Sequence, residues 1–225
     1  MRSICIIPAR GGSKRIIGKN IKLFSGKPII EYSIKNAIKS NLFEKIIVST
    51  DSIEIRNIAL ELGAEVPFLR SKKASNDDAS IEEACIDALN QIDQKYDIIC
   101  CLFSTAPLLS EEDLIKSYNK FILSGSDSLC PIIKHDKPIE KSLIISNNKV
   151  DWLDSNFSKL RTQDLNNLYY DAGQFYFSKV NELYENLDFI NKNTSFVELN
   201  KYDAVDIDTI EDWEFAEKIF KINNI

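Results

Sequence analysis

The clearest chemical signal in this sequence is a group of cations that follows the first apolar segment. Residues 1–30 contain seven Lys and Arg and no acidic residue, although the whole chain has a net charge of −6. The loop PARGGSKRIIGKN, residues 8–20, places Arg10, Lys14 and Lys19 close to Gly11 and Gly12. Backbone N–H groups of a glycine-containing loop, together with cationic side chains, bind polyphosphate. The pattern predicts a local anion site, and a solvated basic loop is the alternative.

This loop differs from two familiar phosphate-binding motifs. A Walker A loop needs four residues between its glycines and a Ser or Thr after its Lys. Here five residues separate Gly12 from Gly18, and Asn20 follows Lys19. The dinucleotide motif G-x-G-x-x-G is absent as well. The sequence therefore supports neither a P-loop ATPase nor an NAD-dependent dehydrogenase.

A pair of carboxylates near the C-terminus is the second chemical signal. One residue separates Asp206 from Asp208, and alternate residues of an extended segment point to the same side. Two carboxylates on one side suit Mg²⁺, which takes hard oxygen ligands and also uses water and phosphate oxygens. The spacing leaves a second interpretation open, in which Asp208 caps the last helix and Asp206 binds nothing.

The composition is that of an ordinary globular protein. The chain has 225 residues, 44% hydrophobic and 28% charged, which fits one domain around a single core. No apolar stretch has the length of a membrane span or a signal peptide, and five cysteines without a C-x-x-C pair predict buried free thiols. We expect a soluble, cytoplasmic protein with no membrane or nucleic-acid partner. A single histidine, His135, excludes a His-rich zinc site, and nothing near it supports a Ser-His-Asp triad.

Short apolar runs alternate with amphipathic segments along the first 130 residues. Strands are expected at SICIIPA, KIIVSTD, AEVPFLR, DIICCLFST and DSLCPI. Helices are expected at residues 27–40, 53–62, 111–123 and 210–222. A further long helix is expected to begin after a cap at Asp77 or Asp78. Strands that are apolar on both faces and alternate with helices form a mostly parallel sheet. The predicted fold class is α/β, a three-layer doubly wound sheet.

Ligands of such sheets bind beyond the carboxyl ends of the strands. That rule gathers residues 9–20, 49–51 and 103–107 around one cleft. The topology and the charge pattern therefore predict a site at the same edge of the sheet.

The pattern changes after residue 131. SLIISNNKVDWL predicts two short strands around an Asn147-Asn148 turn, and GQFYFS predicts a further strand. We interpret residues 131–171 as an arm, inserted in a single domain of residues 1–225, that reaches over the site or towards a second subunit.

Five motifs in order along the chain resemble those of the acylneuraminate cytidylyltransferases, the family of CMP-sialic acid synthetases. They are ARGGSK with the following KN at residues 9–20, VSTD at 48–51, STAPL at 104–108, RTQDL at 161–165 and DIDT at 206–209. The resemblance implies a nucleotidyltransferase-type fold, a homodimer formed through residues 131–171, and a Mg²⁺ ion held by Asp206 and Asp208. It also implies attack of a sugar's anomeric hydroxyl on the α-phosphorus of CTP, with pyrophosphate leaving.

The same resemblance assigns residues to CTP. Arg10 and Lys19 are expected to act in catalysis with the two aspartates, and Asn20 to order the loop or contact the nucleotide. The cytosine is expected near the first loop and residues 74–80, where a helix cap is the alternative role. The expected CTP-binding residues are Ala9, Arg10, Gly12, Ser13, Lys14, Lys19, Asn20, Asn76 and Asp77.

Two departures from the sialic-acid pattern point to another nine-carbon acidic sugar. Phe103 stands where the sialic-acid enzymes have Gln, and Tyr170-Asp171-Ala172-Gly173 stands where they have R-P-N-G. RTQDL followed by YYDAGQFYF is most similar to the pseudaminic acid cytidylyltransferases, whose sugar has a methyl end and a second acylamino group. An unpartnered buried amide costs about 1–3 kcal/mol, so Phe suits a less polar sugar.

The sugar site is expected to combine apolar and hydrogen-bonding side chains. Arg161 or Lys141 would hold the sugar carboxylate, Arg the better because it binds in a bidentate way. Asp171 and Gln174 would bond the acylamino and hydroxyl groups, with loop scaffolding as their alternative role. The expected sugar-binding residues are Phe103, Thr105, Arg161, Gln163, Tyr170, Asp171 and Gln174.

Three alternatives to this function stay open. The first is the same reaction on sialic, legionaminic or an eight-carbon ulosonic acid. The second is a nucleotide-sugar glycosyltransferase, whose D-x-D would be expected in the middle of the chain. The third is a non-catalytic nucleotide-binding protein, against which the joint presence of Arg10, Lys19, Asp206 and Asp208 argues.

Overall fold

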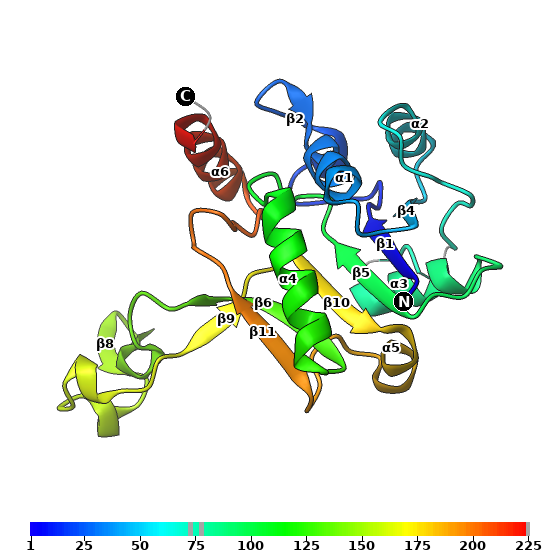
Figure 1. Cartoon of the computed structure of the whole chain (residues 1–225). Helices are drawn as coiled ribbons and strands as arrows, with labels where there is room; N and C mark the ends of the chain where they lie inside the picture. Colours follow the sequence, from blue (N-terminus) through cyan, green and yellow to red (C-terminus); the bar gives the residue numbers. More distant parts are fainter. Residues whose placement is uncertain (72–73, 77–78, 224–225) are drawn as a thin grey trace.

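A seven-stranded sheet forms the centre of the molecule (Figure 1). The computed structural model describes residues 1–71, 74–76 and 79–223. Six strands follow the order β11-β6-β10-β5-β1-β4, and β9 pairs with β6. The strands are β1 (Ser3–Pro8), β4 (Lys45–Ser49), β5 (Ile98–Leu102), β6 (Ser128–Lys134), β9 (Tyr169–Asp171), β10 (Phe175–Lys179) and β11 (Thr194–Glu198).

Most of these strands point the same way. β1 is parallel to β4 and β5, and β11 is parallel to β6. β10 is antiparallel to both β5 and β6, so β6 shares the direction of β5, and only β9 and β10 run in reverse. The prediction of a mostly parallel α/β sheet is confirmed.

Helices cover both faces of the sheet. Alternate side chains of β1 point to opposite faces: Cys5 and Ile7 pack in one apolar cluster, Ile4 and Ile6 in the other. The first cluster lies under α1 (Ile29–Ser40), α2 (Ile53–Glu61) and α4 (Glu111–Ser124). The second lies under α3 (Ile81–Asn90) and α5 (Val180–Asn186). In the described part of the chain no helix combines the length and the apolarity needed to cross a membrane.

A third, smaller cluster fixes the C-terminal helix α6 (Ile210–Asn223). Trp213 of α6 packs edge-on against Phe24, with ring centroids 5.5 Å apart. Phe24 belongs to the small antiparallel pair β2 (Leu23–Phe24) and β3 (Lys27–Pro28), which follows the short helix η1 (Lys19–Ile21). Ile207 is buried in the same cluster. This packing brings the segment before α6 to the loop after β1.

The cap of α3 differs from the predicted one. Ser80 accepts a hydrogen bond from the backbone of Glu83, whose carboxylate bonds back to the Ser80 N–H, a reciprocal cap. The predicted cap residues, Asp77 and Asp78, lie outside the described residues.

The expected strand at residues 64–70 is reduced to one bridge. Glu65 pairs in parallel with Ile47, and its N–H and C=O both bond β4. Pro67 has no N–H to continue the ladder, so the strand stops. The prediction of a full third strand was wrong, because apolar alternation does not reveal where pairing ends. The sequence also did not predict β9, β11 and α5.

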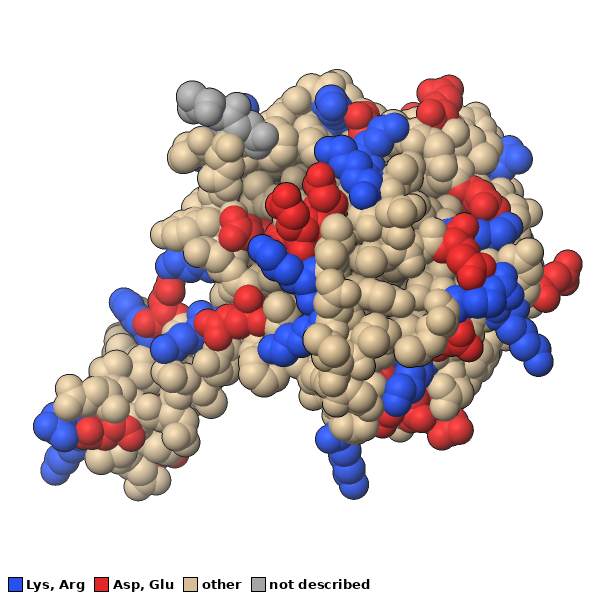
Figure 2. Space-filling model, viewed as in Figure 1, with Lys and Arg blue, Asp and Glu red and all other residues tan. Residues whose placement is uncertain are grey.

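The segment between β6 and β9 projects from the body as a separate lobe (Figures 1 and 2). Residues 131–134 and 169–171 belong to the main sheet, so we define the arm as residues 135–168. It contains the hairpin β7 (Leu143–Ser146) and β8 (Lys149–Trp152), joined by Asn147 and Asn148 at φ 52° and 58°. Its three short helices are η2 (Ile139–Lys141), η3 (Ser155–Phe157) and η4 (Thr162–Asp164). The predicted hairpin is present, and every residue of β7 and β8 is exposed.

Candidate active site

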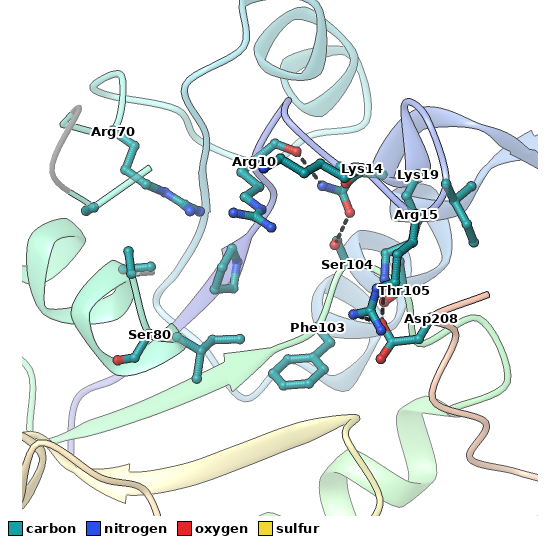
Figure 3. Close-up of a pocket in the computed structure, with 18 of the residues that line it drawn as sticks. Arg10, Lys14, Arg15, Lys19, Arg70, Ser80, Phe103, Ser104, Thr105 and Asp208 are labelled. Atoms are coloured by element: carbon teal, nitrogen blue, oxygen red, sulfur yellow. Dashed lines mark hydrogen bonds and ion pairs between the residues drawn. The ribbon is translucent and has the colours of Figure 1, made fainter. Parts of the chain in front are cut away.

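A cavity of about 390 Å³ lies at the carboxyl ends of β1 and β5 (Figure 3). Four segments form its wall: the loop after β1, the residues around the start of α3, the residues after β5 and the segment before α6. The predicted site residues that line it are Arg10, Ser13, Lys14, Lys19, Asn20, Asn76, Phe103, Thr105, Asp206 and Asp208. Both chemical signals of the sequence, the cations and the carboxylate pair, therefore meet in one cavity.

Asn20 ties the basic loop to the sheet. This side chain is buried; its amide N–H donates to the Arg10 carbonyl at 2.8 Å, and its carbonyl accepts from the Ser104 hydroxyl at 2.7 Å. The Arg10 guanidinium in turn donates to the Asn76 carbonyl at 3.3 Å. The loop is thus anchored at the end of β5 and before α3. Of the two roles expected for Asn20, ordering the loop is the one its contacts show.

Two cationic side chains, those of Arg15 and Lys19, face the Asp208 carboxylate. Arg15 lies 2.8 Å and the Lys19 Nζ 3.4 Å from the Asp208 carboxylate, on one side of the cavity (Figure 3). Lys19 also donates to the Ile207 carbonyl at 2.7 Å. Arg15 was not among the predicted site residues, although its place in the basic loop was the available signal.

Thr209 and Asp212 form the cap of α6. Thr209 donates its backbone N–H and hydroxyl to the Asp212 carboxylate, and the Asp212 N–H donates back to the Thr209 hydroxyl at 3.2 Å. Asp208 contributes only its backbone N–H, which also bonds Asp212. Its side chain is therefore not used as a helix cap and is available to the cavity.

The surroundings of the Asp206 carboxylate differ from those of Asp208. The surrounding protein raises its pKa, with burial as the first cause and repulsion from Asp208 as the second. The residue as a whole is nevertheless exposed, and it lines the cavity. Its carboxylate accepts no hydrogen bond from the described residues, whereas Asp208 is paired with cations.

The two aspartates fit a divalent cation that arrives with phosphate. They are hard oxygen donors lining the same cavity as Arg10 and Lys14. Within the described ranges no cluster of three or more His, Cys, Asp or Glu exists that would hold a metal by itself. Mg²⁺ commonly uses one or two carboxylates and completes its shell with water and phosphate oxygens. The donor set therefore suits Mg²⁺ bound together with a polyphosphate.

A buried arginine that was not among the predicted site residues completes the opposite wall. Arg70 is only 8% exposed and lines the cavity. Its guanidinium donates to the hydroxyl and carbonyl of Ser49, and burial lowers its pKa. The Arg70 N–H bonds the Thr50 carbonyl at 2.8 Å, which turns the chain back towards the sheet. Its position at the end of an expected strand was the one signal available.

Phe103 lines the cavity, and behind it, towards β10, follow the ring of Tyr176 and the carboxylate of Asp171, which are not among the lining residues. The Phe103 ring meets the Tyr176 ring edge-on, with centroids 5.8 Å apart. The Tyr176 hydroxyl donates to the Asp171 carboxylate, and burial followed by this bond raises the pKa of Tyr176. The Gly173 N–H donates to Asp171 at 2.9 Å. Burial and the nearby Asp171 raise the pKa of the Cys130 thiol to about 12.

Some predicted nucleotide residues do not line the cavity. Ala9 is fully buried, and its N–H bonds the Ser49 carbonyl at 2.9 Å. Gly12 is exposed in the loop, and an added Cβ would meet no atom within 4 Å. Asp77 lies outside the described residues.

Two predicted sugar residues next to β9 and β10 also lie away from the cavity wall. Gln174 is fully buried, with its amide directed at backbone carbonyls, so it cannot bond a sugar in the cavity and its predicted role is corrected. The exposed Tyr170 packs against His135, with ring centroids 4.8 Å apart. Asp171 is exposed and adjoins the wall through Gly173 and Asp206.

Two further sugar predictions fall on the arm. Arg161 forms a two-pronged ion pair with Asp164, at 2.8 and 3.0 Å, and is exposed. Gln163 is exposed in η4 between them. Neither residue lines the cavity of its own chain.

Comparisons with known proteins agree on one family. A sequence profile described as Cytidylyltransferase matches residues 4–223. The chain is 44% identical over its full length to the pseudaminic acid cytidylyltransferase of Campylobacter jejuni, covering 98% of that protein. It is 33% identical to the CMP-N,N'-diacetyllegionaminic acid synthase of Legionella pneumophila, with 99% and 98% of the two chains covered. A solved structure of CMP:2-keto-3-deoxy-manno-octonic acid synthetase complexed with CTP superposes with a TM-score of 0.72 at 16% identity, covering 99% of this chain and 100% of that one.

Proposed function

The chain belongs to the cytidylyltransferase family, and on that premise we propose that it transfers CMP from CTP to pseudaminic acid and releases pyrophosphate. One observation carries the proposal: the basic loop after β1 and the Asp206-x-Asp208 segment, nearly 200 residues apart in sequence, line one cavity at the carboxyl ends of the strands. Cations for a triphosphate and carboxylates for its counter-ion are the groups that this transfer needs.

The cations of the loop are assigned to the triphosphate. Arg10, Lys14 and Lys19 face the cavity, with Ser13 between them as a hydroxyl donor. Lys19 is close to Asp208, so phosphate oxygens and that carboxylate would compete for it. Transfer of a nucleotidyl group depends mainly on alignment and charge neutralisation. These residues orient the α-phosphorus and stabilise the charge that develops on the leaving pyrophosphate.

Asp206 and Asp208 are proposed to hold Mg²⁺. When bound, the ion supplies positive charge at the phosphate oxygens. Arg70 is proposed to bind an electronegative group of the nucleotide from the opposite wall. Among the described residues its buried guanidinium bonds only Ser49, which leaves N–H donors unused.

The apolar side of the cavity supports pseudaminic acid as the acceptor. Phe103 and Tyr176 form an aromatic corner beside Asp171. An aromatic corner suits a methyl-bearing sugar, and the Asp171 carboxylate is a hydrogen-bond acceptor that an acylamino N–H can reach. Legionaminic acid, a related nine-carbon sugar, is the main alternative.

The arm is proposed to pair two copies of the chain. In the β7–β8 register, Leu143 faces Trp152 and Ile145 faces Val150, so four apolar side chains share one face. All four are more than one third exposed, and Ile145 is 79% exposed. An isolated two-stranded hairpin is marginally stable in water, so another surface is expected to cover this face. A two-fold axis would bring two such faces together.

Such a dimer would give the arm residues a role. Arg161 and Gln163 do not line the cavity of their own chain, so we assign them to the site of a second copy. The Arg161 guanidinium would then exchange Asp164 for the sugar carboxylate, which it can bind with two parallel hydrogen bonds.

The test is pyrophosphate release from CTP and MgCl₂ with each of three sugars and without sugar. Pseudaminic acid is expected to give the highest kcat/KM, N,N'-diacetyllegionaminic and N-acetylneuraminic acids lower values, and the sugar-free reaction none. A higher kcat/KM with either other sugar would overturn the choice of acceptor while leaving the reaction type. No release with any sugar, by folded protein that binds CTP, would overturn the proposed reaction.

A further inference from the structure

Gln174 occupies a position that the proposed reaction does not explain. It is fully buried, and its backbone carbonyl accepts the Phe103 N–H at 2.9 Å. Its side-chain amide donates to the carbonyls of Ala172, Gly173 and Val205, at 2.9, 3.1 and 3.3 Å. The amide oxygen is buried and has no hydrogen-bond partner among the described residues. The side chain is therefore placed for its donor group, which joins the turn at residues 171–174 to the segment before α6.

The residues that Gln174 holds are the ones that flank Asp206. Val205 precedes Asp206 in the chain, and Gly173 lies across from its carboxylate. A Cβ added to Gly173 would stand 3.2 Å from the Asp206 Cγ and 3.3 Å from one carboxylate oxygen. Gly173 also has φ +60°, which favours glycine. The Gln174 amide thus holds the backbone at Val205, just before Asp206. It also holds Gly173, against which the Asp206 carboxylate packs.

Asp206 depends on this support more than Asp208 does. Arg15 and Lys19 orient Asp208 by charge, at 2.8 and 3.4 Å. For Asp206 no hydrogen bond is found in the described part of the chain, so packing against Gly173 and the course of the backbone set its orientation.

We propose that Gln174 is a positioning residue that keeps the Asp206 carboxylate turned into the cavity for the divalent cation. The inference rests on the proposed function, because it needs the cation that accompanies CTP. Groups that orient metal ligands without touching the metal typically change metal affinity by about 10- to 100-fold when removed. A merely structural Gln174 would instead affect stability and all ligands alike.

The experiment compares CTP binding with and without metal, by calorimetry, in wild type and Gln174→Met. Methionine keeps the length and volume of the side chain and removes the amide donors. CTP affinity in EDTA is expected to stay within about twofold of wild type. In MgCl₂ the variant is expected to bind CTP about tenfold more weakly than wild type. A second measurement, the MgCl₂ concentration for half-maximal pyrophosphate release, is expected to rise by a similar factor.

Asn36→Leu provides a matched control, because Asn36 also donates a side-chain amide to a backbone carbonyl, that of Leu109, but outside the cavity. It is expected to leave the metal effect on CTP affinity unchanged. Should Gln174→Met not fold, Gln174→Asn takes its place; this shorter amide remains polar but is one methylene too short for Val205.

Two results would overturn the proposal and can be told apart. If Mg²⁺ strengthens CTP binding equally in wild type and variant, or the variant loses affinity equally in EDTA, the positioning role fails and the proposed function stands. If Mg²⁺ does not affect CTP binding in wild type, the proposed cation fails together with the role of Gln174.

Discussion

The loop at residues 8–20 and the arm at residues 135–168 both carry basic and polar side chains that the sequence assigns to substrates, yet the fold holds them differently. Asn20 is buried and bonds both Arg10 within the loop and Ser104 in the distant segment after β5. On the arm, Asp164, three residues away, is the only residue of the described ranges that Arg161 bonds. Local ion pairs between exposed side chains contribute little to stability.

The body and the arm therefore differ in whether contacts within one chain position their substrate-assigned residues. The body positions its cavity residues through contacts between distant segments, so their geometry is fixed without a partner. The arm exposes an apolar hairpin face and carries Arg161 away from its own cavity. In the proposed dimer we therefore expect the arm's residues to act at the site of a second copy, and those of the body at the cavity of their own chain.

The largest effect is expected in the body, from Asp208→Asn. The change removes a negative charge that Arg15 and Lys19 both contact, and with it one of the two proposed ligands of the cation. We expect kcat for pyrophosphate release to fall about a thousandfold, the scale of losing a directly charge-stabilising group. Stopped assays at saturating CTP measure it. Glu211→Gln, an exposed neighbour in α6, should retain activity, and an Asp208→Asn enzyme within tenfold of wild type would contradict the assignment.

The next largest effect is expected from a substitution in the arm, and it concerns dimer formation. Ile145→Asp places a charge in the apolar hairpin face, and we expect the dimer dissociation constant to rise at least about a hundredfold, because burying that side chain contributes roughly 2–3 kcal/mol. Analytical ultracentrifugation over a concentration series measures it. Ser146→Asp, the next residue on the opposite face of the hairpin, serves as the control and should leave the dimer intact. A wild-type chain that is monomeric at all concentrations would contradict the comparison drawn between body and arm.

The sequence predicted the parts of the fold that follow from local pattern. Strands β1, β4, β5, β6 and β10, the hairpin and five of the helices (α1, α2, α3, α4 and α6) lie where apolar periodicity placed them. The strand at residues 64–70 failed because Pro67 ends its pairing after Glu65, a fact of register that periodicity does not contain. β11 was missed because it is a partly exposed edge strand with little apolar alternation.

For the candidate site too, the sequence predicted what depends on local pattern and missed what depends on tertiary contacts. Cations and carboxylates could be selected by type and spacing, and the strand-end rule predicted that Arg10 and Thr105 would meet. Gln174 could not be assigned correctly, because only the tertiary structure shows that it is buried against Val205. Arg70 was overlooked because a buried cation is recognised by its surroundings, and an isolated Arg at the end of a short segment carries no such information.

A smaller effect in the body would sharpen the view that distant segments build the nucleotide site. Arg70→Lys keeps the charge but loses the planar fork that bonds Ser49 while facing the cavity. We expect KM for CTP to rise about tenfold, with KM for the sugar unchanged within about twofold. Initial rates with each substrate varied in turn measure both constants. Equal increases in both would indicate a general distortion of the cavity and contradict a role at the nucleotide.

A last effect, of similar size, concerns the choice of sugar, which we expect the body alone to determine. Phe103→Gln replaces an aromatic ring that packs on Tyr176 with an amide. The amide favours a sugar that offers hydroxyls, and it disturbs the corner that holds Asp171 through the Tyr176 hydroxyl. We expect the ratio of kcat/KM for pseudaminic acid over N-acetylneuraminic acid to fall by about tenfold, the usual range for one apolar or hydroxyl contact. Phe103→Leu, which remains apolar, should keep most of that ratio. If Phe103→Gln leaves this ratio unchanged and Arg161→Ala lowers it, the arm and not the body discriminates between the sugars. That result would contradict the expectation that the body alone selects the sugar.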